Sequence, residues 1–306
     1  MKKKLVKIIA MLLCVVCFGA CGKPEDAKST KSKGEITIGS KTFTENLVLG
    51  NIMVQYLKFL GYTVHDETGL GETAIIRKAL TSGEIDGYFE YTGTGLMQFM
   101  KHDPVFDVDE TYKIINEWDK KNEITWLPYT AANNTYVMVT TEKLAKKHNL
   151  KNVSDLAKAY NEGNSITLVT ASESYERPDM MPRLMKVYGF NVPNKNRLNV
   201  ELGLFYEALK NGKAEVTTGF ATDGVIKRDG YVPLKDDKNA FAVYSIAPVF
   251  RTEVLKTYPN LEQEISKLTK LINNEVLMDL NSQVDIDKKT VEEVAAKFLK
   301  DNKLIK

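Results

Sequence analysis

The chain carries LKFLGYTV at residues 57–64 and a related octet, MKVYGFNV, 128 positions later at residues 185–192. Two further pairs keep nearly the same spacing: ITI at residues 36–38 with ITL at 166–168, and ALTSGE at 79–84 with ALKNGK at 208–213. A repeat this long is not a solenoid, whose units span a few tens of residues. The matched blocks therefore predict two related lobes on one chain, with a cleft between them.

Each copy has the pattern of strands alternating with helices, which predicts an α/β fold. In the first copy we expect strands at residues 35–40, 62–67 and 85–91, and helices at 45–60 and 74–81. In the second copy we expect strands at residues 166–170 and 215–220, and helices at 178–188 and 204–210. Thr44 is the expected cap of the first helix, Pro178 begins the helix at 178–188, and Gly61 and Gly189 are the expected stops.

Two extended segments lie outside the repeat and predict two crossings between the lobes. The apolar run at residues 135–140 is the expected first crossing, and the run at 241–250 is the expected return. This organisation divides the chain into lobe one, residues 35–133 plus 246–306, and lobe two, residues 134–245. The tail after residue 261 is predicted to be helical and to pack on lobe one, with Thr290 capping a helix whose apolar face holds Val291, Val294, Ala295, Phe298 and Leu299.

The first twenty residues have the features of a lipoprotein signal peptide. Lysines near the start precede an apolar run, residues 5–18, that is too short for a transmembrane helix. Phe18-Gly19-Ala20-Cys21 resembles the lipobox of bacterial lipoproteins, which predicts cleavage before Cys21 and a diacylglycerol on its thiol. The alternative is an ordinary secretory signal with an incidental cysteine. Residues 21–34 are then a flexible tether, and the mature protein is extracytoplasmic and anchored to the cell membrane.

Charge and residue types exclude several function classes. Loss of the four lysines among residues 1–20 changes the formal net charge from +2 to −2, and no basic tract suits nucleic acid. Cys14 and Cys17 fall within the signal, so the mature chain has no cysteine pair for a disulfide or a metal. The three histidines, His65, His102 and His148, have no metal-ligand spacing. We therefore expect a binding protein and not an enzyme, without metal or cofactor, although an enzyme on the same scaffold stays an alternative.

Four aromatic residues could form one box in the predicted cleft. Tyr91 and Phe220 follow matched strands, Tyr136 begins the first crossing, and Tyr244 lies in the second. Aromatic faces carry negative potential, which suits a quaternary ammonium that cannot donate hydrogen bonds. The alternative is that each of these rings belongs to the core.

Three polar residues in strand-end loops could hold the opposite charge of such a ligand. They are Lys41, Thr94 and Arg177. Arg177 is expected to begin a helix, where backbone N–H groups also favour an anion. A cationic box beside an anion clamp describes a pocket for a zwitterion. The alternative is that Lys41 and Arg177 are ordinary surface charges.

Four motifs resemble the landmarks of osmoprotectant substrate-binding proteins of ABC importers for glycine betaine, carnitine, choline and proline betaine. They are GSKTFTE at residues 39–45, EYTGT at 90–94, ERPD at 176–179 and FATDG at 220–224. The resemblance runs from about residue 34 to the C-terminus. It implies a two-lobed periplasmic-binding-protein fold, type II-like, with two crossover strands.

The resemblance also implies residue roles. By motif, the cage tyrosines correspond to Tyr91, Tyr136 and Tyr244, and the contacts to the ligand's carboxylate correspond to Lys41, Thr94 and Arg177. Phe220 stands where members usually have tyrosine, so its ring keeps the cation–π attraction and loses the hydroxyl. The implied mechanism is closure of a monomer on its ligand and delivery to a membrane permease. The alternative is the same fold with an amino acid or another betaine-like metabolite as ligand.

Overall fold

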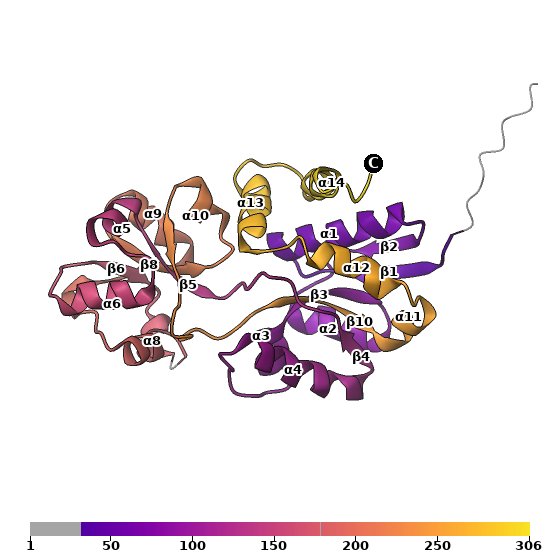
Figure 1. Ribbon diagram of the computed structural model, residues 1–306, viewed down its shortest axis with the longest axis horizontal. Coiled ribbons are helices and arrows are strands. Elements are labelled where there is room, and N and C mark those ends of the chain that lie inside the picture. Colours follow the sequence, from indigo (N-terminus) through magenta and orange to yellow (C-terminus); the bar gives the residue numbers. More distant parts are fainter. Residues whose placement is uncertain (1–31, 178) are drawn as a thin grey trace, which may run out of the picture. The chain divides into compact units, whose positions relative to one another are not determined.

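The computed structural model describes residues 32–177 and 179–306 (Figure 1). The predicted signal peptide, the predicted lipidation site Cys21, most of the predicted tether at 21–34 and Pro178 lie outside the described residues. Within the part that is described, no helix is both long enough and apolar enough to cross a bilayer.

Two five-stranded mixed sheets organise the described chain. The first has the order β2-β1-β3-β10-β4 and the second the order β7-β6-β8-β5-β9. The strands are β1 Glu35–Gly39, β2 Thr63–Glu67, β3 Gly87–Tyr91, β4 Ile124–Trp126, β5 Tyr136–Thr140, β6 Leu168–Thr170, β7 Arg197–Asn199, β8 Val216–Phe220, β9 Val232–Leu234 and β10 Ile246–Arg251. In each sheet the first three strands of the order are parallel and the fourth is antiparallel to both neighbours. The predicted repeat and the predicted α/β fold are confirmed.

The chain passes between the sheets twice, which is the predicted number (Figure 1). The predicted crossing segments were placed too far along the chain, because residues 136–140 form β5 and residues 246–251 form β10 within the sheets. The first passage lies between β4 and β5, and the second between β9 and β10. The two passages pair with each other, because Asn133 and Ser245 form an isolated antiparallel bridge. Tyr244 N donates to Asn133 Oδ1 at 2.7 Å, and Asn134 N donates to Tyr244 O at 3.2 Å. These bonds hold the two connecting segments side by side.

Helices surround both sheets. They are α1 Thr44–Phe59, α2 Thr73–Ser82, α3 Thr92–Thr94, α4 Val108–Asp119, α5 Glu142–His148, α6 Val153–Asn161, α7 Glu173–Glu176, α8 Met181–Tyr188, α9 Phe205–Lys210, α10 Gly224–Arg228, α11 Thr252–Thr257, α12 Leu261–Thr269, α13 Asn274–Asp285 and α14 Val291–Asp301. A wide π-turn at Gly95–Phe99 continues α3, and short 3₁₀ turns occupy Lys120–Asn122, Asn194–Asn196 and Leu202–Leu204.

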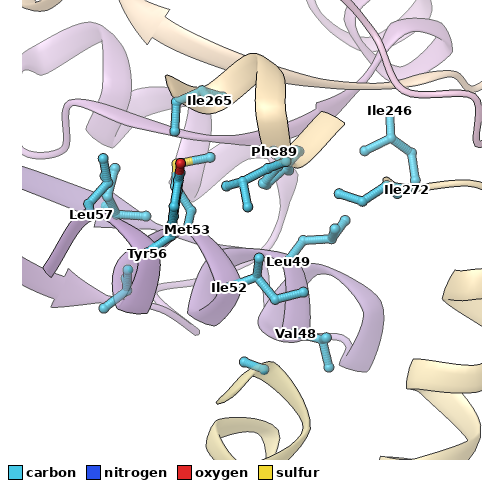
Figure 2. Close-up of a cluster of buried hydrophobic side chains, with 14 of the residues drawn as sticks. Val48, Leu49, Ile52, Met53, Tyr56, Leu57, Phe89, Ile246, Ile265 and Ile272 are labelled. Atoms are coloured by element: carbon cyan, nitrogen blue, oxygen red, sulfur yellow. The ribbon is translucent and has the colours of Figure 1, made fainter. Parts of the chain in front are cut away.

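Helix α1 is the centre of the largest hydrophobic core. Figure 2 shows Leu49, Ile52 and Met53 of α1 grouped with Phe89 of β3 and Ile265 of α12. A helix that is apolar on most of its faces needs cover on several sides, and the C-terminal helices supply it. Helix α14 packs against α1 and buries most of its predicted apolar face, which confirms the prediction for the end of the tail. Helix α13, however, packs against α10 as well as α1, so the tail also contacts the part of the chain predicted as lobe two.

The predicted helix signals are right at some positions and wrong at others. Thr290 caps α14 in a full capping box with Glu293, as expected. Thr44 does not cap α1, because it is already helical and its hydroxyl donates to Asp285 Oδ1 at 2.6 Å instead. The helix expected at 178–188 begins at Met181, and Pro182 occupies its first turn. Gly189 ends that helix with a φ of +67°, a left-handed backbone that favours glycine.

Candidate ligand-binding site

The site lies where corresponding strands of the two sheets end. Tyr91, the last residue of β3, pairs with Ile246 at the start of β10. Phe220, the last residue of β8, pairs with Tyr136 at the start of β5. Each aromatic residue therefore stands beside one of the two passages between the sheets. This placement follows from the shared strand order of the two sheets.

A cavity of about 240 Å³ gathers residues from both sheets and both passages. Its lining is Lys41, Phe43, Thr73, Tyr91, Thr94, Asn134, Tyr136, Phe220 and Tyr244. Every predicted ligand-binding residue except Arg177 belongs to this set. Arg177 lines an adjacent cavity of about 140 Å³ that shares Tyr136 and Phe220 with the first. A larger cavity of about 520 Å³ contains Tyr136 but none of the other predicted cage residues.

The rings lie in pairs. Tyr136 and Phe220 have centroids 5.0 Å apart with planes inclined by 32°. Phe43 and Tyr91 have centroids 5.8 Å apart with planes inclined by 39°. Phe43 was missed by the sequence reasoning, although it stands between Lys41 and Glu45 in the GSKTFTE motif. Its side chain is 40% exposed, which is unusual for a large apolar residue and marks it as a wall of the open cavity.

Lys41 is buried and already has a partner. Its Nζ lies 2.6 Å from Glu90 Oε1, and the two side chains are 3% and 0% exposed. Glu90 also accepts from Tyr88 Oη and from the Tyr91 backbone N–H, each at 2.8 Å. The Lys41 ammonium lies 5.0 Å from the centroid of the Tyr91 ring. Lys41 thus lines the cavity as half of a buried ion pair, and the alternative that it is an ordinary surface charge is wrong.

Arg177 is also paired with a carboxylate. It makes two hydrogen bonds with Asp179, at 2.7 and 3.1 Å, and these lower the pKa of the Asp179 carboxyl. Its guanidinium lies 5.8 Å from the centroid of the Tyr136 ring, and Nη1 donates to Tyr136 Oη at 3.5 Å. Arg177 follows the end of the short helix α7 and has extended backbone. The prediction that it begins a helix is wrong, so no helix dipole supports an anion there.

The turn after β3 fits closely against the second passage. A Cβ on Gly93 would lie 2.3 Å from Val243 O and 2.9 Å from the Tyr244 ring. Only glycine lets the backbone of α3 come this near, and the same turn carries Thr94 into the cavity. The hydroxyl of Thr92 is buried there with no hydrogen-bond partner among the described residues.

A buried carboxylate stands behind the rings. Glu45 Oε1 accepts from Tyr91 Oη at 2.8 Å and from Asn134 Nδ2 at 3.0 Å, and Oε2 accepts from Asn281 Nδ2 at 3.2 Å. Burial raises the pKa of Glu45, while the side-chain hydrogen bonds from Thr222, Tyr91, Asn281 and Asn134 oppose that rise. Burial and the Glu45 carboxylate together raise the pKa of the Tyr91 phenol. Glu45 and Asn134 were both missed from sequence, because their contacts join distant segments.

Nothing in this arrangement forms a metal centre. Across residues 32–177 and 179–306, no group of three or more His, Cys, Asp or Glu side chains converges in a way that could hold a metal ion. Of the histidines, His65 is exposed in β2, His102 is exposed in a loop and His148 ends α5. The cavity instead combines aromatic faces with a hydroxyl, an amide and paired charges, which are groups that can bind a small ligand.

Comparisons with known proteins agree on one family. The family described as the substrate-binding domain of ABC-type glycine betaine transport systems matches residues 34–301. A glycine-betaine-binding protein of Pseudomonas aeruginosa is 32% identical over 96% of this chain and 94% of its own length. The carnitine transport binding protein OpuCC of Listeria monocytogenes is 31% identical over 99% of this chain and 98% of its own length.

A solved structure has the same architecture. Ligand-free YehZ from Escherichia coli aligns with a TM-score of 0.83 and 29% identity, covering 88% of this chain and 99% of that one. The likeness extends over both sheets of the chain, because the aligned part is nearly nine-tenths of its length.

Proposed function

The chain belongs to the substrate-binding domains of ABC-type glycine betaine transport systems, and on that premise we propose that it captures a quaternary ammonium osmoprotectant. Candidates are glycine betaine, carnitine, choline and proline betaine. The observation that carries the proposal is the single cavity lined by Tyr91, Tyr136, Phe220 and Tyr244. The names of the Pseudomonas and Listeria relatives support the same ligand class.

The aromatic lining explains why a methylated nitrogen would be preferred. A quaternary ammonium offers no N–H group, so hydrogen-bond acceptors cannot recognise it, whereas the faces of aromatic rings attract it electrostatically. Each such contact contributes about 0.5–2 kcal/mol, with the larger value when water is excluded. Three or four rings together with a charged clamp would bring the affinity near micromolar, which corresponds to about −8 kcal/mol.

Rings from both sheets also supply a reason for closure on the ligand. Tyr91 belongs to the first sheet, and Tyr136 and Phe220 belong to the second. A ligand shifts a conformational equilibrium only by binding one state better than the other. A cation held between rings of both sheets binds a closed state better than an open one. For this movement we propose lobe one at residues 35–133 plus 246–306, and lobe two at residues 134–245.

For a ligand that carries a carboxylate, we propose Thr94 and Arg177 as its contacts. Arg177 reaches the Tyr136 hydroxyl at 3.5 Å, so its charge lies beside the aromatic box. Asp179 would have to share the Arg177 guanidinium with the ligand or release it. We propose that Lys41 acts through its ion pair with Glu90, since its charge is already balanced.

The remaining parts of the proposal concern the setting of the protein. We propose a signal peptide at residues 1–20, lipidation at Cys21 and an extracytoplasmic, membrane-anchored monomer. It would hand its ligand to an ABC permease without transforming it. Labelling with a radioactive fatty acid, compared between the natural chain and Cys21→Ala, tests the anchor. Equal labelling of the two would reject it.

Isothermal titration calorimetry with the four candidate ligands tests the binding function. Phe220→Ala should weaken the preferred ligand about tenfold, because one ring face is lost from the cavity. Phe59→Ala is the matched control, since Phe59 is an exposed phenylalanine at the end of α1. The function is rejected if the natural chain binds none of the four. Tight binding of an unmethylated amino acid would favour the alternative ligand class.

A further inference from the structure

Glu45 occupies a position that the ring-and-clamp description of the site does not use. It lies in the first turn of α1 and is only 3% exposed. A buried carboxylate is costly unless hydrogen bonds or counter-charges satisfy it. Its burial at the start of a largely apolar helix therefore calls for a reason beyond packing.

The partners of Glu45 suit the ionised form. Tyr91 Oη, Asn134 Nδ2 and Asn281 Nδ2 all donate to its two oxygens, at 2.8, 3.0 and 3.2 Å. A protonated carboxyl would need an acceptor for its own O–H, whereas a carboxylate is acceptor-only. Charge-assisted bonds of this kind are about twice as strong as neutral ones. The geometry thus fits a negative charge held beside the cavity.

Two of these partners are themselves walls of the cavity. Tyr91 and Asn134 both line the space with Tyr136, Phe220 and Tyr244. The Glu45 carboxylate therefore lies directly behind two residues of the cavity wall, Tyr91 and Asn134. The Asn134 amide uses its nitrogen on Glu45, and its buried Oδ1 has no hydrogen-bond partner among the described residues. This oxygen adds a second negative potential within a residue that lines the cavity.

We propose that Glu45 is a positioning residue of the cage, which orients Tyr91 and Asn134 and gives the cage a net attraction for a cation. This inference rests on the proposed function and deepens it. A phenol that donates to a carboxylate becomes richer in electrons, so its ring face attracts a cation more strongly. The carboxylate also acts directly, because charges interact more strongly in a buried site than in water.

The competing explanation is a purely structural role. Asn281 also donates to Thr222 O at 3.0 Å, so Glu45 belongs to a network that joins α1, the first passage between the sheets, α13 and the loop after β8. A residue with only that role would affect binding through the fold. Substitutions of such a residue would lower the ligand affinity according to how many hydrogen bonds they break, whether or not they remove the charge. The two explanations therefore predict different orders of affinity for the same variants.

Calorimetry with choline separates them, because choline is a permanent cation without a carboxylate. Glu45→Gln keeps the length of the side chain and removes its charge, whereas Glu45→Asp keeps the charge and shortens the side chain. We expect choline to bind Glu45→Gln about tenfold more weakly than the natural chain, with Glu45→Asp clearly closer to the natural affinity. Glu292→Gln, an exposed carboxylate on α14, is the control of equal charge change and should bind normally.

Each other result has a definite meaning. Normal choline binding by Glu45→Gln, or an equal loss in Glu45→Asp, overturns the inference and leaves the proposed function standing. If the natural chain binds no quaternary ammonium, the proposed function fails and takes the inference with it. If circular dichroism shows that the Glu45 variants do not fold, Tyr91→Phe replaces them, since it keeps the ring and removes only the hydroxyl that donates to Glu45. It should lose several-fold in choline affinity, and an unchanged affinity overturns the inference.

Discussion

Lys41 Nζ lies 2.6 Å from Glu90 Oε1 in a place where both side chains are shielded from water. The two residues are 49 positions apart and meet because β1 and β3 are neighbours in the first sheet. The pair places a lysine at the edge of the cavity without leaving a net charge there. The cavity wall at Lys41 is consequently a balanced ion pair beside aromatic rings, and not a bare ammonium.

Glu90→Gln should destabilise the protein by about 3–5 kcal/mol, because it leaves the Lys41 ammonium buried without a counter-charge. Chemical denaturation measures this change in the free energy of unfolding. Glu142→Gln is the control, since it breaks an exposed pair with Lys146 on α5 and should cost less than about 1 kcal/mol. Equal losses in the two variants would show that burial of the Lys41 pair has no special cost.

Asp179→Asn should favour ligands that carry a carboxylate. The change removes the group that competes for Arg177, so the affinity ratio of glycine betaine to choline should rise about two- to fivefold. Calorimetry with both ligands measures the ratio. Glu173→Gln is the control and should change the ratio less, because the Glu173 carboxylate lies 3.9 Å from Arg177 and is largely exposed. A ratio that does not move would mean that Arg177 makes no contact with the carboxylate.

The stability of the ligand-free protein should depend on pH through Glu45. Folding raises the Glu45 pKa above its ordinary value of 4.5, so the folded state holds a proton more tightly than the unfolded chain does. This contribution is therefore fully present below pH 4.5 and is lost as the pH rises through the raised pKa of the folded state. Buried Asp223, whose pKa burial also raises, contributes with the same sign.

Denaturation curves at a series of pH values check this contribution. Glu45→Gln should remove the part of the decline in stability that begins above pH 4.5, and Asp223→Asn should remove the part that begins above pH 3.8. Identical pH profiles for Glu45→Gln and the natural chain would contradict the prediction.

Gly93→Ala should weaken both folding and ligand binding. The new methyl would meet the backbone oxygen of Val243 at 2.3 Å, so the turn that carries Thr94 must move away from Tyr244. Overpacking of this kind costs about 1–3 kcal/mol. Gly203→Ala is the control, because a Cβ there meets nothing within 4 Å. Thermal denaturation and calorimetry test the two effects, and a Gly93→Ala protein with natural stability would refute the close fit.

The secondary structure was predictable where local signals agreed with the tertiary fold. Gly189 and Thr290 act as expected, because a left-handed turn and a helix cap depend on neighbouring residues. Thr44 failed as a cap because Asp285, far away in sequence, takes its hydroxyl. The predicted start of the helix after Arg177 was wrong, because the chain first forms the short helix α7 and the next helix begins only at Met181. Local rules are weakest where a distant partner competes for the same group.

The sequence by itself determined the repeated alternation of strands and helices and the aromatic residue at the end of β3 and of β8, since both follow from the pattern along the chain. It also contained the motif residues that line the cavity. The order of the strands within each sheet came from the tertiary structure. Only the tertiary structure decided which charges are free. Glu90 pairs with Lys41, and Glu45 stands behind Tyr91, because strand and helix packing brings together groups that are more than forty positions apart. Charge balance is a property of burial and distance, and a linear pattern specifies neither.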